Sequence, residues 1–92
     1  MEIQDLRKTI DEIDNGIVDL YLRRVETVRE ISRYKREKGL PVADPAREEQ
    51  LLDRVAERAG AENAEGIREL FRLLMAQSRA RQQAERGTEV RE

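Results

Sequence analysis

Hydrophobic residues in the first forty positions recur at alternating intervals of three and four residues. Two sets of positions carry the pattern, and we call them together the apolar seam: Ile3, Ile10, Ile17, Arg24 and Ile31, with Leu6, Ile13, Leu20, Thr27 and Tyr34. This spacing is typical of a helix with one apolar side. Because no proline interrupts the stretch, we expect a single helix from about residue 2 to about residue 38.

A helix of this length is too long for a compact domain of 92 residues. At ~1.5 Å per residue it would extend roughly 55 Å, whereas such a domain is about 30 Å across. The weak point is Asn15-Gly16, since this dipeptide is a strong turn signal. The seam stays in register through Ile13, Ile17 and Leu20, so we expect the helix to continue and its apolar side to require a partner chain.

A second, shorter helix is expected after Gly39, which marks the end of the first. Asp44 precedes Pro45, and this pair predicts a helix start because aspartate is a good N-cap and proline is favoured at the first helical position. The helix should end near Ala59. Its buried stripe is expected to comprise Leu51, Leu52, Val55 and Ala59.

A third helix should begin after Asn63, which can cap it, and reach about Glu85. Arg79 and Arg81 on this helix are expected to face solvent. Residues 86–92 are mostly charged and contain Gly87, so we expect a frayed tail. The predicted fold is all-α, with three helices (long, short and medium) in one domain over residues 1–85. The third helix should bury Ile67, Leu70, Phe71, Leu74, Met75 and Ser78.

The composition excludes several classes of site. The chain has no cysteine and no histidine, which removes disulfides, thiolate nucleophiles and histidine acid–base catalysis. No loop has calcium-binding spacing, so we expect no metal and no cofactor. Acidic and basic residues nearly balance, at 20 and 18, which argues against a nucleic-acid partner. Because the sequence has no membrane-length apolar run and no signal-peptide core, we expect a cytoplasmic protein with no membrane partner.

Two cations interrupt the apolar side of the long helix. Arg24 and Lys35 are eleven residues apart, about three turns, so they share a face with Val28 and Ile31. Arg7 precedes Arg24 by seventeen residues, which is more than about 20 Å along a helix. Arg7 could therefore join such a site only from a second chain. The alternative is that Arg24 and Lys35 extend to solvent or form interhelical ion pairs.

The other two helices add further polar groups. Asp44, Arg47 and Glu48 lie within one turn of each other at the start of the second helix, although acids there also stabilise a helix N-terminus. Ser78 and Gln82 are one turn apart on the third helix, where they could equally form a satisfied buried contact. Taken with the cations of the long helix, these groups include no nucleophile–base pair and suit the binding of a small dianion.

These residues, in this order, resemble the all-helical chorismate mutases. The resemblance covers residues 3–84 and implies an intertwined homodimer built from three helices of each chain. Each of its two active sites would take an arginine from the neighbouring chain. The matching elements are Leu6-Arg7, Ile10-Asp11-Glu12-Ile13-Asp14, Arg24, Ile31, Lys35, Pro41-Val42-Ala43-Asp44, Arg47-Glu48, Phe71-Arg72-Leu73-Leu74, Ser78 and Gln82.

The activity implied by the resemblance is that of an isomerase of aromatic amino acid biosynthesis, which rearranges chorismate to prephenate without a cofactor. Arg24 and the partner's Arg7 would bind the two carboxylates of this small-molecule substrate, with Arg47 and Ser78 nearby.

The resemblance also implies which groups act on the rest of the substrate. Lys35 and Gln82 would hydrogen-bond the ether oxygen, and Glu48 would bind the ring hydroxyl with help from the backbone around Asp44. Lys35, Gln82, Arg24 and Glu48 would thus be the catalytic residues. The apolar wall of the site would be formed by Val28, Ile31 and Met75.

Two other functions fit the same pattern. An isochorismate-pyruvate lyase has the same fold, but that group lacks the acidic residues of the second helix, so Asp44 and Glu48 favour the mutase. A non-catalytic helical dimerisation module would pair its charges across the helices and leave no pocket.

Overall fold

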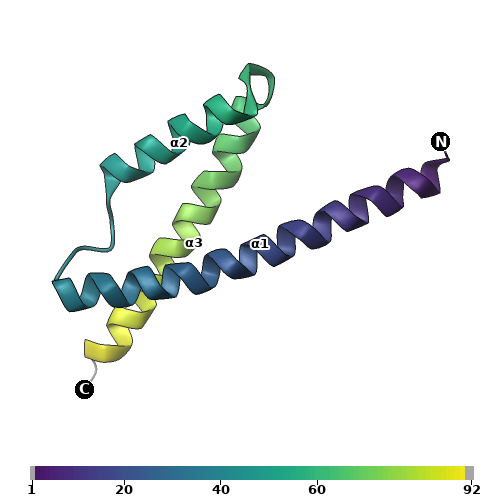
Figure 1. Cartoon of the computed structure of the whole chain (residues 1–92). Helices are drawn as coiled ribbons and strands as arrows, with labels where there is room; N and C mark the ends of the chain where they lie inside the picture. Colours follow the sequence, from purple (N-terminus) through teal and green to yellow (C-terminus); the bar gives the residue numbers. More distant parts are fainter. Residues whose placement is uncertain (1, 91–92) are drawn as a thin grey trace.

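The computed structural model describes the backbone of residues 2–90 and the side chains of residues 2–86. Its elements are α1 (Ile3–Lys38), α2 (Pro45–Ala59), the short 3₁₀ helix η1 (Ala61–Asn63) and α3 (Ala64–Val90). The prediction of an all-α fold with a long first helix is confirmed. As Figure 1 shows, α3 crosses the C-terminal half of α1 and meets α2, while the N-terminal half of α1 extends away from both. The backbones of α1 and α2 stay apart, and α3 joins them.

Helix α1 is continuous over 36 residues. Gly16 lies within it and does not break it, which confirms the prediction made from the register of the seam. At the N-terminus, the Glu2 carboxylate and the Asp5 carboxylate each accept a hydrogen bond from the other's backbone N–H, which satisfies donors that the helix leaves free. At the C-terminus, Gly39 has a φ of 68°. This left-handed conformation suits glycine and ends the helix.

Helix α2 begins as the Asp44-Pro45 pair predicted. The Asp44 carboxylate accepts a hydrogen bond from the backbone N–H of Arg47 at 3.1 Å, and the helix ends at Ala59 before η1. The side-chain amide of Asn63 donates to the carbonyl of Ala59 at 3.5 Å. This hydrogen bond is made to the last residue of α2. The sequence had instead predicted that Asn63 would cap the start of α3.

Helix α3 is longer than the sequence suggested. It extends to Val90, five residues beyond the predicted end near Glu85, and residues 91–92 lie outside the described part of the chain. Most of its predicted stripe faces the other helices, whereas Leu70 is 48% exposed in the single chain. Near the end of α3, the Arg86 guanidinium donates to the carbonyl of Leu40 and holds α3 against the loop between α1 and α2.

A small core joins α2 to α3. Its buried members are Leu51, Val55 and Met75, which are brought together because each recurs at helical spacing on the inner side of its own helix. The side chains packed against them are Leu52, Ile67 and Phe71. This core covers little of α1, whose buried residues among those described are Val28 and Ser32.

The apolar seam of α1 is largely uncovered in the single chain. The radius of gyration is 16.9 Å, against about 12 Å for a compact domain of this size, because the N-terminal half of α1 extends away from α2 and α3 (Figure 1). Six residues of the seam are between 49% and 61% exposed: Ile3, Leu6, Ile10, Ile13, Ile17 and Leu20.

Within the described residues, no helix is long and apolar enough to cross a membrane.

Candidate active site

A cavity of about 310 Å³ lies where the three helices and the loop before α2 face each other. Its size is that of a small-molecule site. Of the residues predicted for the site, Arg7 alone does not line it: Arg7 lies on the extended half of α1, about 25 Å along the helix from Arg24. The lining comprises Arg24, Val28, Ile31, Lys35, Val42, Asp44, Arg47, Glu48, Leu51, Met75, Ser78, Arg79 and Gln82.

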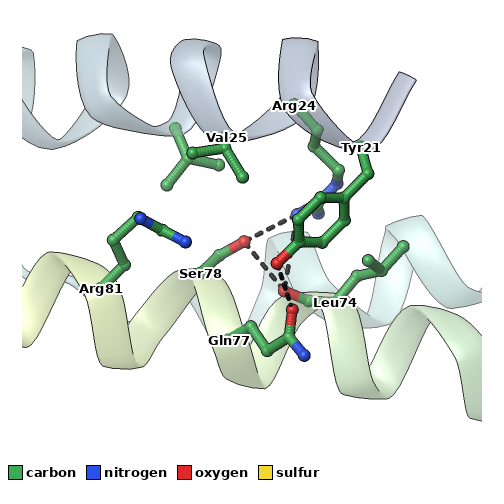
Figure 2. A pocket seen from close by; sticks show the side chains of 8 residues that line it. Tyr21, Arg24, Val25, Leu74, Gln77, Ser78 and Arg81 are labelled. Atoms are coloured by element: carbon green, nitrogen blue, oxygen red, sulfur yellow. Dashed lines mark hydrogen bonds between the residues drawn. The ribbon is translucent and has the colours of Figure 1, made fainter. Parts of the chain in front are cut away.

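Arg24 is held against α3 at one side of this cavity. Its guanidinium donates to the hydroxyl of Ser78 at 2.7 Å and to the carbonyl of Leu74 at 3.5 Å, as Figure 2 shows. Burial lowers the pKa of Arg24 from its usual value, and the nearby Tyr21 raises it by a smaller amount. An arginine remains charged under such a shift, so Arg24 presents a partly dehydrated cation that is already oriented.

Figure 2 also shows a group of polar side chains next to Arg24. The hydroxyl of Tyr21 donates to the side-chain oxygen of Gln77 at 2.8 Å and ties α1 to α3. A void of only about 10 Å³ remains here, too small for more than one water. Arg81 lines this void and is half-buried, so the prediction that it faces solvent was wrong. The void therefore offers no room for a substrate.

Lys35 lines the cavity from the last turn of α1. Its ammonium donates to the carbonyl of Val42 at 2.8 Å, in the loop that Arg86 also holds through Leu40. Because one acceptor satisfies only one of its three donors, the Lys35 ammonium can still bind a ligand. At the start of α2, Arg47 is exposed and reaches the same cavity.

Glu48 and Arg79 form an ion pair across the cavity wall. The guanidinium of Arg79 is 2.5 Å from the carboxylate of Glu48, so the prediction that Arg79 faces solvent was wrong. Sequence spacing contained a signal for it, since Arg79 is four residues after Met75 and three before Gln82. Residues with this spacing share a helix face, and both neighbours line the cavity.

Gln82 is a buried polar residue at the cavity, with an exposed fraction of 6%. Its side-chain oxygen has no hydrogen-bond partner among the described residues. An unsatisfied buried polar atom is costly, by about 1–3 kcal/mol, and polar groups of a binding site are the common exception because a ligand completes them. Val28 and Met75 are buried beside it, whereas Ile31 is 44% exposed.

The charges of the cavity favour an anionic ligand. Four cations and two carboxylates line it, and three of the cations, Arg24, Lys35 and Arg79, are held by contacts to the protein before a ligand arrives. Within the described residues, no group of three carboxylates could hold a metal ion. No serine or threonine of the lining has a histidine as a base, because the chain contains none. The site can therefore orient and polarise a ligand, without a nucleophile–base pair to attack it. The cations are Arg24, Lys35, Arg47 and Arg79, and the carboxylates are Asp44 and Glu48.

Comparisons with known proteins identify the family of the chain. Residues 6–83 match the family model of chorismate mutase type II. The chain is 32% identical over 84 residues to a chorismate mutase of Methanocaldococcus jannaschii, a match that covers 88% of this chain and 84% of that protein. No solved structure matches the chain at a significant level.

Two further relatives match the chain over only part of their own length. The chain is 35% identical over 81 residues to the T-protein of Haemophilus influenzae, covering 85% of this chain and only 21% of the T-protein. It is 36% identical over 58 residues to a 4-amino-4-deoxychorismate mutase of Streptomyces venezuelae, covering 63% of this chain and 56% of that protein. Since the family model spans most of the sequence and the M. jannaschii protein aligns along nearly all of it, the chain belongs to the chorismate mutase type II family.

Proposed function

We propose that the cavity binds chorismate and accelerates its rearrangement to prephenate. The rearrangement is unimolecular: the ether C–O bond breaks as a new C–C bond forms, with no proton transfer and no covalent intermediate. It requires the enolpyruvyl arm to be folded over the ring and negative charge on the ether oxygen to be stabilised. The observation that carries the proposal is a cavity of suitable size with fixed cationic donors on two sides, one of them formed by Arg24 and Ser78.

The substrate carboxylates are assigned to the arginines. Arg24 is oriented by Ser78 and Leu74, and a guanidinium binds a carboxylate through two parallel hydrogen bonds. Arg47, at the rim of the cavity, is a second cation for the same purpose. Holding both carboxylates selects the folded conformation of the substrate, so that part of the entropic barrier is met on binding.

The ether oxygen is assigned to Lys35 and Gln82. Lys35 is a charged donor anchored by Val42, and the buried Gln82 would donate to the ether oxygen through its side-chain NH2 group. Donors that point at a developing negative charge stabilise the transition state more than the ground state. Glu48 is assigned to the ring hydroxyl, and Asp44 lies beside it at the start of α2.

The functional form is proposed to be a homodimer in which the long helices pair. Six residues of the seam are about half exposed in the single chain, and burying each side chain fully is worth about 1.5–3 kcal/mol. A second copy supplies the complementary surface by symmetry. It would also supply Arg7, which the length of α1 keeps out of the cavity of its own chain. Each active site would then contain residues of both chains.

Incubation of the purified protein with chorismate, and separately with isochorismate, tests this function. Without any added cofactor, prephenate should form from chorismate much faster than in buffer, as measured by chromatography of the products. Salicylate and pyruvate from isochorismate, with chorismate unchanged, would contradict the mutase and support the lyase. If neither substrate reacted faster than in buffer, the catalytic proposal would be wrong and a dimerisation module would remain.

A further inference from the structure

We propose that Arg79 determines substrate specificity by pairing with Glu48, so that the site accepts a ring hydroxyl and disfavours a ring ammonium. The proposal rests on the proposed function, which assigns Glu48 to the ring hydroxyl. It concerns chorismate and its 4-amino analogue, which differ at this one group. One relative is named a 4-amino-4-deoxychorismate mutase, so proteins similar to this chain are named for each of the two compounds.

The two side chains come from different helices and meet at the wall of the cavity. Glu48 is in the first turn of α2, and Arg79 is in the middle of α3. Their atoms are 2.5 Å apart, and their side chains are 28% and 38% exposed respectively. Both line the main cavity, and both also line a second cavity of about 460 Å³ together with Met75 and Pro45. The ion pair is therefore part of the wall of the main cavity, which keeps a volume of about 310 Å³ beside it.

The pairing changes what Glu48 can bind. A carboxylate alone attracts an ammonium strongly, because opposite charges within a few ångströms of each other in a partly buried site are poorly screened. When Arg79 is paired with it, the carboxylate and guanidinium together are neutral, and the guanidinium repels a second cation placed beside the carboxylate. A neutral hydroxyl needs only an acceptor, and an ionised carboxylate has about four acceptor positions, of which the Arg79 contact occupies one.

The remaining charges near Glu48 do not replace this function. Asp44 is a second carboxylate at the start of α2, but its side chain accepts the backbone N–H of Arg47 as the helix cap. Lys35 is bound to the carbonyl of Val42. Among the contacts described for the residues that line the cavity, Arg79 is the cation paired with Glu48. Its loss would leave the Glu48 carboxylate without the cation with which it is paired.

The test compares kcat/KM for chorismate and for 4-amino-4-deoxychorismate at neutral pH, where the amino group carries a positive charge. Arg79→Met removes the cation and keeps the length of the side chain, whereas Arg79→Lys keeps a cation and should retain the wild-type preference. Arg72→Met is the matched control, since Arg72 is on the same helix and pairs with the exposed Glu65 at 3.4 Å. We expect the preference for chorismate to fall at least tenfold in Arg79→Met and to stay unchanged in Arg72→Met.

A change in preference separates this role from a structural one. If Arg79→Met lowered kcat/KM for both substrates by the same factor, Arg79 would only support the fold and the inference would be wrong. In a Glu48→Gln background, adding Arg79→Met should no longer alter the preference; an unchanged effect there would also refute the pairing. Should Arg79→Met not fold, Arg79→Gln gives the same comparison. A wild-type protein inactive on both substrates would refute the proposed function itself, which is a different outcome.

Discussion

Replacing Lys35 by alanine tests the assignment of the ether oxygen. In the free protein the Lys35 ammonium donates to the carbonyl of Val42 at 2.8 Å, and with substrate present it is proposed to donate to the ether oxygen as well. Loss of one fixed donor to a developing oxyanion typically lowers kcat by about 10²–10³-fold. Loss of the bond to Val42 would also lower the free energy of unfolding by about 1 kcal/mol, which leaves the protein folded at the assay temperature.

Steady-state kinetics with chorismate distinguishes this effect from weaker binding. Lys35→Ala should lower kcat by about 10²–10³-fold, whereas Arg24→Lys, which keeps the charge but loses the guanidinium and its hydrogen bonds to Ser78 and Leu74, should act mainly on KM. Lys38→Ala is the control: Lys38 is on the same helix, lies 5.9 Å from the ring of Tyr34 and is exposed. If Lys35→Ala and Arg24→Lys raised KM comparably and left kcat unchanged, the assignment of the ether oxygen to Lys35 would be wrong.

Two further predictions concern stability, measured as the free energy of unfolding in urea. Gly16→Ala should stabilise the protein by about 1 kcal/mol, because glycine is unfavourable within a helix and no atom lies within 4 Å of the added carbon; a destabilised variant would mean that a partner packs against this position. Ser32→Ala should be neutral or stabilising by about 1 kcal/mol, because the Ser32 hydroxyl is 1% exposed and has no partner among the described residues. A loss above about 1 kcal/mol would reveal a hydrogen bond to a partner chain or water.

The boundaries of the helices could be predicted from the sequence because local residues determine them. Gly39 ends α1 in the left-handed conformation, and Asp44 caps α2 through its own side chain. The dipeptide Asn15-Gly16 is compatible with a turn, but the unbroken register of the apolar positions correctly predicted that the helix continues through it. The end of α3 was predicted too early, because charged residues with one glycine are compatible with both a helix and a frayed tail.

The polar residues of the candidate site could be selected from the sequence where their chemistry conflicts with their position. Arg24 and Lys35 lie on an otherwise apolar face, and both line the cavity. Arg79 was missed because a basic residue on a charge-rich helix has an ordinary explanation in solvent exposure. Its partner, Glu48, lies 31 positions away, and no local pattern brings the two together. The crossing of α2 and α3 had to be known first.

Each active site is proposed to be built from residues of two chains, and mixed dimers test this proposal directly. Arg7→Ala and Lys35→Ala variants are each expected to be nearly inactive alone. Unfolded together and refolded as a mixture, half of the dimers should contain one chain of each kind. Each such dimer has one site with both residues intact, so the mixture should recover about a quarter of the wild-type activity. Activity no higher than the mean of the two variants would show that Arg7 and Lys35 do not meet across the dimer.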